Sequence, residues 1–291
     1  MSTPVGLSPV VPEILEVLGS EPWKALNKVL ASDLTGLADG EMRPGLLLHP
    51  KGQFRGMMAV ARLGEELWLL VPQGFGETLS QSLNHYLQFS KVQVRTKDEP
   101  RFLWLGETSP GLPLPAAQPW RCLRQGPARY FFATLLGLPG VLVVGQEAPG
   151  LPSVSLAQLE LARIAAGFPA WGKELTPDVL PGEAGLGEPW VSLRKGCYPG
   201  QETMARLATY GHVNRLLVRL RGSQTACLAG KPLPVELEAE GPGSKKGRLT
   251  SWAVDEQGEA WALGLVHRTV AREGVCLVAC GAPFQVQAVL A

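Results

Sequence analysis

The sequence predicts an α+β protein in which two mixed helix-and-strand units are followed by a small all-β domain. Helical and strand periodicities alternate in the first third of the chain, and a similar mixture resumes after a proline-rich connector. From Val213 onward, strand-like pieces recur at roughly ten-residue spacing, which is typical of a small β-barrel or sandwich. A chain of 291 residues also exceeds one typical core. We therefore expect three domains, at 1–105, 106–212 and 213–291.

The first unit begins with two short amphipathic stretches within residues 13–31. The second of them starts at SEP, residues 20–22, where a cap residue precedes a proline in the first turn, and its apolar side chains recur at helical spacing. Further along, apolar alternation predicts strands, and one longer 3.6-residue period predicts a helix. The expected strands are 45–48, 57–62, 67–71, 91–96 and 101–105, and the expected helix runs from Thr78 to Phe89.

Residues 106–120, GETSPGLPLPAAQPW, contain four prolines and two glycines. This composition favours a stiff extended connector, and we place the first domain boundary there. Beyond it, the pattern predicts strands at 129–136 and 140–145. A helix is expected to start with the capping-box pattern SLAQ at 155–158 and to end at Gly167.

The last part of the chain carries six strand-like pieces, namely LLVRLRG, VELEAEG, GRLTSWAV, EAWALGLVHRTV, GVCLVAC and FQVQAVL. They predict the all-β domain. The turn GPGSKKGR at 241–248 is its most hydrophilic segment. Its basic side chains could contact phosphate, but a solvated loop is the simpler interpretation.

The charge balance excludes several classes of partner. There are 27 Lys and Arg against 26 Asp and Glu, so no global field attracts nucleic acid or anionic lipid. Basic residues are not interleaved with aromatic ones, which also argues against direct tRNA binding. The longest apolar runs fall far short of the ~20 residues that span a bilayer. The N-terminal MSTPVGLSPVVPEILEV does not resemble a secretory signal, so we expect a cytoplasmic protein.

Five cysteines are scattered along the chain, which fits reduced thiols better than a disulfide framework. Cys276 and Cys280 would face the same side of a strand. No histidine or further cysteine stands at ligand spacing, so buried structural thiols are expected there and no metal site is predicted. The sequence has no GxxxxGK[ST], and no GxGxxG lies between a strand and a helix, which argues against nucleotide binding by those routes.

The stretch KGCYPGQE at 195–202 sets several reactive side chains among two glycines and a proline. Pro199 and Gly200 are a turn pair, and Gln201 opens a helical apolar period. We therefore predict a strand at 190–193, a tight turn, and then a helix.

Cys197 in this stretch could react, bind a metal or build the turn. Arg194 and Lys195 beside it favour the thiolate, which is the nucleophilic form. His212 is a conceivable base, although it lies beyond the predicted helix. From the residues alone, a structural or substrate-lining role for Cys197 is favoured over a nucleophile.

Two carboxylates are candidates for binding a ring edge that carries an amide and an amino group. A carboxylate accepts two parallel N–H bonds from such a donor pair. Asp33 in ASDLTGL could instead cap a helix or form a turn, and Glu183 in LPGEAGL could lie in a solvated loop. Spacing alone favours the loop interpretation for Glu183.

KGCYPGQE, with ETMARL continuing from its last residue, resembles the K-G-C-Y-x-G-Q-E signature of the YgfZ-type folate-binding proteins. These are relatives of the glycine-cleavage T protein, an aminomethyltransferase. An eight-residue match with Cys and Tyr between glycines is specific. The resemblance extends over residues 15–72 and over 162–186, where a P-x-E-x-x-L pattern precedes the signature.

The resemblance implies a three-lobed ring, in which two ferredoxin-like α+β units and a C-terminal β-barrel surround a folate-binding channel. In the T protein the glutamate of P-x-E-x-x-L holds the pterin, and Glu183 occupies the matching position. The implied cofactor is tetrahydrofolate or a one-carbon derivative. The folate-binding residues expected on this basis are Glu183, Asp33, Arg194, Lys195, Tyr198 and Gln201.

One departure from the family pattern concerns catalysis. T proteins carry a G-G-x-x-D-D hairpin with a catalytic aspartate, whereas the corresponding segment here is KGQFRGMM, with Arg55 and Gly56 at the paired-acid positions. An arginine cannot act as a carboxylate that supports the folate amine or a developing iminium charge. Aminomethyl transfer is therefore not predicted.

The resemblance instead implies the branch associated with maintaining iron–sulfur enzymes, including the radical enzymes that thiomethylate tRNA, with the motif cysteine, here Cys197, implicated. Tyr198 and Gln201 would support the turn. Arg194 and Lys195 would favour the Cys197 thiolate and attract the glutamate tail of folate.

We thus expect a tetrahydrofolate-binding accessory protein for iron–sulfur enzyme maturation or repair. Its partners would be folate and iron–sulfur enzymes or assembly factors. The alternative is a folate-dependent aminomethyltransferase or demethylase-like enzyme, for which Asp33 would be the nearby acid.

Overall fold

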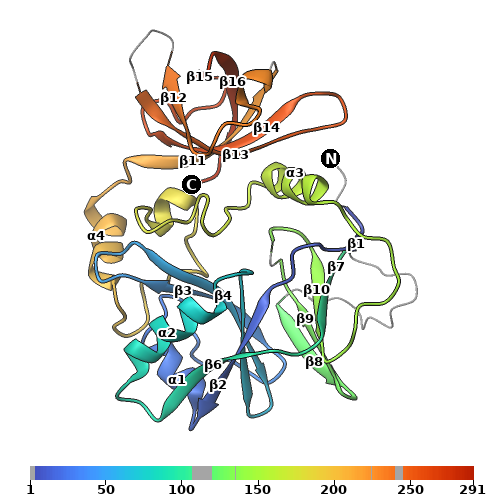
Figure 1. The fold of residues 1–291 in the computed structure, drawn as a ribbon. Coiled ribbons are helices and arrows are strands. Elements are labelled where there is room, and N and C mark those ends of the chain that lie inside the picture. The colour runs from blue at the N-terminus through green and yellow to red at the C-terminus, as the bar shows by residue number, and fades with distance from the viewer. Residues whose placement is uncertain (1–3, 107–119, 135, 224, 240–244) are drawn as a thin grey trace. The chain divides into compact units, whose positions relative to one another are not determined.

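The chain forms two compact units. We call Ser2–Leu156 together with Glu188–Met204 the two-sheet unit, and Ala157–Gly187 together with Ala205–Ala291 the barrel unit. The structure is a computed structural model (Figure 1). It describes residues 4–106, 120–134, 136–223, 225–239 and 245–291.

The first sheet of the two-sheet unit is antiparallel, with the strand order β3-β4-β5-β2-β6. Figure 1 labels all of these strands except β5. Two helices accompany it, and leucines one turn apart on the longer helix pack into the core of the sheet. The elements are β2 (Glu13–Gly19), α1 (Pro22–Asn27), β3 (Met42–Leu48), β4 (Phe54–Leu63), β5 (Glu66–Val71), α2 (Gly76–Leu87) and β6 (Val92–Lys97).

The strands and the long helix predicted for this region are confirmed. Of the two amphipathic stretches within 13–31, the first is the strand β2 and the second is the helix α1. Pro22 stands in the first turn of α1 as expected, but the N-cap position belongs to Glu21 rather than to Ser20.

The second sheet of this unit has the order β1-β7-β10-β9-β8. The strand β7 follows β6 closely in sequence but pairs with β1 and β10, so the chain changes sheets between Lys97 and Arg101. The strands are β1 (Gly6–Leu7), β7 (Arg101–Leu105), β8 (Arg121–Gln125), β9 (Ala128–Phe132) and β10 (Gly140–Val144).

The predictions for this part of the chain had mixed outcomes. The strands expected at 129–136 and 140–145 are present as β9 and β10. The strand β8 was not predicted, because most of its side chains are polar and only Cys122 is buried. The connector expected at 106–120 falls outside the described residues except for its two ends.

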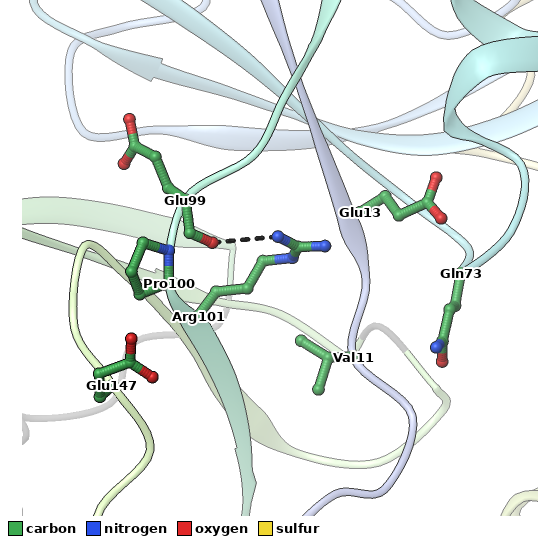
Figure 2. A pocket seen from close by; sticks show the side chains of 7 residues that line it. All are labelled: Val11, Glu13, Gln73, Glu99, Pro100, Arg101 and Glu147. Atoms are coloured by element: carbon green, nitrogen blue, oxygen red, sulfur yellow. Dashed lines mark hydrogen bonds between the residues drawn. The ribbon is translucent and has the colours of Figure 1, made fainter.

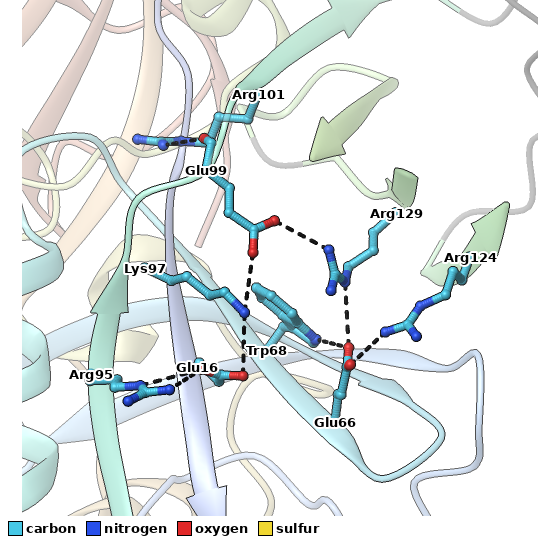
Figure 3. Close-up of polar contacts among 9 residues, drawn as sticks. All are labelled: Glu16, Glu66, Trp68, Arg95, Lys97, Glu99, Arg101, Arg124 and Arg129. Atoms are coloured by element: carbon cyan, nitrogen blue, oxygen red, sulfur yellow. Dashed lines mark hydrogen bonds and ion pairs between the residues drawn. The ribbon is translucent and has the colours of Figure 1, made fainter. Parts of the chain in front are cut away.

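A network of charges around Trp68 joins the two sheets of this unit (Figure 3). The Lys97 ammonium and the Arg129 guanidinium each lie 4.6 Å from the centre of the buried Trp68 ring. Glu66 accepts a hydrogen bond from the indole N–H at 3.0 Å, and Glu99 lies within 3.2 Å of both cations. Cation–π contacts of this kind strengthen when they are shielded from water, so the network holds the sheets together.

The barrel unit contains a closed six-stranded barrel with the order β11-β14-β13-β12-β15-β16, drawn in orange and red in Figure 1. The predicted order of two mixed units followed by a β-barrel is confirmed. The barrel strands are β11 (Arg215–Gly222), β12 (Val235–Ala239), β13 (Lys245–Val254), β14 (Ala260–His267), β15 (Cys276–Ala279) and β16 (Ala282–Val289).

Helix α3 (Leu156–Ala166) and the segment that follows it are fastened to β13 by a buried polar network. The fully buried Glu174 accepts hydrogen bonds from Thr250 at 2.7 Å, from Ser251 at 2.6 Å and from Arg163 at 3.0 Å. Arg163 also pairs with Glu160 at 2.7 Å. Because the buried charges are paired and hydrogen-bonded, these interactions offset the cost of removing the charges from water.

The Glu160 ion pairs predict an acid-dependent loss of stability. Burial alone would raise the pKa of this carboxyl, but hydrogen bonds and charges from Arg163 and Lys173 lower it to about 2, from an ordinary value of 4.5. The unfolded chain therefore binds more protons in this interval, and the stabilisation is present above pH 4.5 and lost as the pH falls towards 2. We expect it to be worth roughly 2 kcal/mol after screening.

Denaturant unfolding at a series of pH values measures this contribution. The substitution Glu160→Gln should flatten the acid limb of the stability curve, whereas Glu273→Gln, at an exposed position in the same unit, should leave it unchanged. Equal acid limbs for Glu160→Gln and the wild type would contradict the assignment.

Candidate functional site

The segment that precedes the signature is irregular, and the strand predicted at 190–193 is wrong. Pro189 has no N–H to offer a ladder. The amide of Ser192 instead donates to the carbonyl of Ala31 at 2.9 Å, and Leu193 is exposed. The turn and the helix predicted after it are confirmed, since α4 (Gln201–Tyr210) begins directly after Gly200. We call residues 190–200 the motif loop.

Trp190 ties the start of the motif loop to the second sheet. Its ring meets that of Trp120 edge to face, with centroids 6.2 Å apart and an interplanar angle of 83°. Trp120, which precedes β8, has a φ of 60°, an uncommon value for a residue other than glycine. Both rings are half-buried.

The start of α4 touches the turn between β3 and β4 through two glycines. Gly200 has a φ of 85°, and a Cβ there would lie 2.8 Å from the carbonyl oxygen of His49 and 3.0 Å from the Cα of Gly52. Gly52 has a φ of 88°, and its own Cβ would lie 3.0 Å from Thr203. Only glycine fits such an approach, so the signature and the KGQF hairpin depend on each other.

The Lys195 side chain turns into the two-sheet unit. Its ammonium donates to the carbonyl oxygens of Asn27 at 2.5 Å, Leu30 at 2.6 Å and Ser32 at 2.8 Å. Burial lowers its pKa to about 8 against the attraction of Asp33, which raises it. The group is therefore charged at neutral pH, and its three donors are occupied, which leaves none for a folate carboxylate in this conformation.

Tyr198 and Gln201 also support the loop from inside. The Tyr198 hydroxyl is buried and donates to the carbonyl of Ser192 at 2.9 Å, and burial raises its pKa to about 12. The Gln201 amide donates to the carbonyl of Lys195 at 3.2 Å. Both residues thus hold the loop closed on itself.

Asp33 follows Ser32, whose carbonyl oxygen accepts a hydrogen bond from Lys195. Burial alone would raise the pKa of its carboxyl, but hydrogen bonds from Thr35 and the charges of Lys195 and Arg43 together hold it below its usual value. The backbone N–H of Thr35 donates to its Oδ1 at 2.8 Å. Asp33 is therefore an ionised hydrogen-bond acceptor and has no proton to donate.

Two site residues of the motif loop face solvent. The Cys197 thiol is free and exposed. The Arg194 guanidinium is exposed and has no polar partner within the described part of the chain. His212, the conceivable base, belongs to the barrel unit, whereas Cys197 belongs to the two-sheet unit.

The positions corresponding to the paired acids have other contacts. Arg55 on β4 is exposed and lies over the Tyr86 ring of α2, 5.8 Å from its centre. Gly56 is buried, and a Cβ there would lie 2.3 Å from Cδ1 of Leu79. An acidic side chain at Gly56 would therefore collide with the helix that covers the sheet.

Glu183 lies in the barrel unit, in a turn of 3-10 helix (Pro181–Ala184), and is 4% exposed. The guanidinium of Arg215 on β11 donates two hydrogen bonds, of 2.9 and 2.8 Å, to the Glu183 carboxylate. The amide of Leu180 donates a third to the same carboxylate at 3.0 Å. The bond to Glu183 raises the pKa of Arg215 above its ordinary value. A carboxylate offers about four acceptor positions, so one further donor fits without displacing a partner.

Sequence reasoning missed Arg215, and the surroundings of this residue explain why it matters. It also pairs with Asp178 at 3.0 Å, and Asp178 in turn pairs with Arg248 at 3.0 Å. Burial alone would raise the pKa of Asp178, but bonds from Thr176 and the two arginines hold it far below its usual range. No short-range pattern marks Arg215, which stands 32 residues beyond its partner Glu183.

A separate open cavity of about 360 Å³ lies in the two-sheet unit (Figure 2). The Glu13 carboxylate at its edge accepts the amides of Gly74 and Gly76 at 2.7 and 2.6 Å, at the start of α2. Arg101 donates to the carbonyl of Glu99 at 3.0 Å. The side chains of Glu13 and Arg101 thus form hydrogen bonds with backbone groups around the cavity. No residue of the motif loop lines the cavity.

Within the described residues, no group of three or more His, Cys, Asp or Glu side chains could hold a metal ion. Of the helices that the structure describes, none combines the length and the apolar character needed to cross a bilayer.

Comparison with solved structures identifies the fold as T-protein-like. The chain matches the glycine cleavage system aminomethyltransferase T of Bartonella henselae with a TM-score of 0.81, over 98% of this chain and 86% of that one. The identity is 18%, so the likeness concerns the fold. It confirms the T-protein-like fold class expected from the sequence.

Sequence comparison finds one relative along most of the chain and two that match a shorter part of it at higher identity. An uncharacterized protein of Haemophilus influenzae is 26% identical over 90% of this chain and 88% of its own length. A putative chloroplastic transferase of Arabidopsis thaliana and an aminomethyltransferase of Moorella thermoacetica are each 37% identical over 127 residues, or 43% of this chain. These matches span only 27% and 32% of the two relatives' lengths. No protein-family model matches the chain.

The packing of Gly56 against Leu79 predicts a coupled pair. We expect Gly56→Ala to destabilise the protein by about 1–3 kcal/mol, because the added methyl overpacks a closed core. Leu79→Ala removes the colliding atom, so the double variant should be more stable than the sum of the single effects predicts. Denaturant unfolding of the four proteins gives the coupling energy, and strictly additive effects would contradict the contact.

Proposed function

We propose that this chain binds tetrahydrofolate or a one-carbon derivative and supports the maturation or repair of iron–sulfur enzymes, without catalysing aminomethyl transfer. The observation that carries the folate part is the buried Glu183 carboxylate, held by Arg215 within a T-protein-like fold. The Moorella relative is named an aminomethyltransferase, which supports a folate-related ligand.

The chemistry of the pterin ring suits this carboxylate. The ring edge carries N–H donors on an amide and an amino group, and a carboxylate is an acceptor without donors. The double hydrogen bond from Arg215 fixes the plane of the Glu183 carboxylate before a ligand arrives, which lowers the entropic cost of binding. Arg215 and the amide of Leu180 occupy three of the about four acceptor positions of the carboxylate, which leaves one for a donor of the ring.

Two further residues are proposed contacts on chemical grounds. Asp33 is an ionised acceptor, and Arg194 is an exposed cation without a polar partner among the described residues. The glutamate tail of folate carries carboxylates, for which a guanidinium offers a matching pair of donors. Lys195, Tyr198 and Gln201 would act through the loop that they hold.

The absence of transferase activity is proposed from Arg55 and Gly56. Arg55 brings a positive charge where an acid would have to stabilise one, and Gly56 has no room for a side chain beside Leu79. A chain of this kind would keep a folate site while losing the group that drives transfer.

The iron–sulfur part of the proposal rests on the similarity of KGCYPGQE to the YgfZ-type signature and on the exposure of Cys197. An exposed thiol can reach a partner's cluster, an oxidant or a folate-bound one-carbon unit. The proposed partners are iron–sulfur enzymes or their assembly factors in the cytoplasm, and tRNA methylthiolation would depend on the protein indirectly.

Calorimetric titration with tetrahydrofolate and its formyl and methyl forms tests the ligand. We expect one-to-one binding that weakens at least tenfold, about 1.4 kcal/mol, in Glu183→Gln, because the neutral amide offers only one acceptor atom. The matched variant Glu273→Gln, at an exposed position of the barrel unit, should bind like the wild type.

The outcomes of this titration separate the possibilities. Equal affinity of wild type and Glu183→Gln would show that the pterin is held elsewhere, and no binding to folded protein would reject folate as the ligand. Measured turnover of an aminomethyl or methylamine donor with tetrahydrofolate would instead support a folate-dependent aminomethyltransferase or demethylase-like enzyme.

Complementation tests the role of Cys197. In cells that lack the gene, we expect wild type to restore the activity of iron–sulfur enzymes that thiomethylate tRNA, and Cys197→Ser to restore less than a tenth of that activity. Cys280 was expected to be buried but is another exposed free thiol, and Cys280→Ser should restore the activity fully. If Cys197→Ser performed as well as Cys280→Ser, the thiol would have no such role.

A further inference from the structure

Residues 29–34, between α1 and β3, are mostly buried although they belong to neither a helix nor a strand. We call residues 27–35 the Asp33 turn. Leu30, Ala31, Ser32 and Leu34 in this turn are at most 1% exposed. A buried irregular backbone needs hydrogen-bond donors for its carbonyl groups, because water cannot reach them.

Most of the donors come from two places outside the turn, and the amide of Leu37 serves the carbonyl of Leu34 at 3.1 Å. Arg43 on β3 donates to the carbonyls of Asp33 at 3.0 Å and Thr35 at 2.8 Å. The motif loop supplies donors to the carbonyls of Asn27, Leu30 and Ser32, through the ammonium of Lys195, and to that of Ala31, through the amide of Ser192. Four of the carbonyls of this turn thus depend on the motif loop, and three of those depend on one side chain.

We propose that Lys195 is a positioning residue, which fixes the Asp33 turn and thereby the direction of the Asp33 carboxylate, and that it does not itself contact the ligand. The side chain spans from residue 195 to carbonyls on both sides of the turn, at Asn27 and at Ser32. The Asn27 amide oxygen, 3.2 Å from the same ammonium, accepts the amide of Leu34 at 2.8 Å. Lys195 therefore also orients the side chain that closes the turn.

Lysine is suited to this position by its shape. An ammonium directs three donors from one compact centre, whereas the guanidinium of arginine is a planar fork suited to carboxylates and phosphates. Three carbonyls that converge on one point match the ammonium. Neither arginine nor glutamine reproduces that arrangement, so both substitutions should leave carbonyls of the turn without donors.

Hydrogen exchange of the folate-free protein tests the positioning role directly. We expect the amides of Ala31, Leu34 and Thr35 to exchange at least tenfold faster in Lys195→Met, and faster than wild type in Lys195→Arg. Lys91→Met removes an exposed lysine before β6, outside the turn, and should leave these rates unchanged. Wild-type rates in Lys195→Met would overturn the proposal.

A second measurement needs only the wild-type protein and covers the case in which Lys195→Met does not fold. Reductive methylation followed by mass spectrometry should modify the exposed Lys51 at least tenfold faster than Lys195, whose nitrogen is enclosed by carbonyl oxygens. Equal rates at the two lysines would overturn the proposal.

The link from the turn to the ligand rests on the proposed folate site and is tested separately. Tetrahydrofolate should bind Lys195→Met at least tenfold more weakly than Lys91→Met. Faster exchange with unchanged affinity would overturn the link through Asp33. Absence of folate binding by the wild type would reject the proposed function, while the exchange and methylation results would still decide whether Lys195 holds the turn.

Discussion

The need to supply donors to the buried carbonyls of residues 27–35 is the constraint on which the signature segment depends. In a helix or a sheet, backbone N–H groups of the same element would donate to those carbonyls. Most of this turn belongs to neither, so its carbonyls need other donors. Lys195 and the amide of Ser192 reach it from a part of the chain more than 150 residues away. The conformation of the motif loop is consequently set by the positions of the carbonyls to which Ser192 and Lys195 donate.

This constraint divides the signature into two sets of side chains. Lys195, Tyr198 and Gln201 donate to backbone carbonyls, and the glycines allow backbone to approach backbone. Cys197 faces solvent and has no part in this framework. A signature can thus be specific for mainly structural reasons, with its chemistry confined to one or two positions.

The sequence predicted the elements well where a single periodicity decided them. The barrel strands, α2 and α4 follow their apolar patterns, and the turn at Pro199-Gly200 follows from its residues. The strand expected at 190–193 is absent because tertiary contacts of Ser192 decide its conformation. The strand β8 has almost no apolar pattern, and its conformation follows from pairing with β9 and from backbone contacts with residues 40–41.

The site was predicted in its residue types but not in its pairings. Glu183 and Asp33 were recognised as carboxylates, yet the arginine that grips Glu183 comes from a barrel strand and carries no local signal. Likewise, the sequence shows only that a glycine stands at position 56 in place of an acid. It does not show that Leu79 of α2 leaves no room for a side chain there unless α2 repacks. Contacts between distant segments hold this information.

The edge-to-face pair of Trp120 and Trp190 has a consequence for how the loop can be observed. Indole rings that meet at a steep angle couple their electronic transitions, so circular dichroism in the indole bands is sensitive to their contact. One ring lies at the start of the motif loop and the other beside β8. The protein therefore carries an intrinsic optical signal that reports, without any label, whether the loop is seated on its sheet.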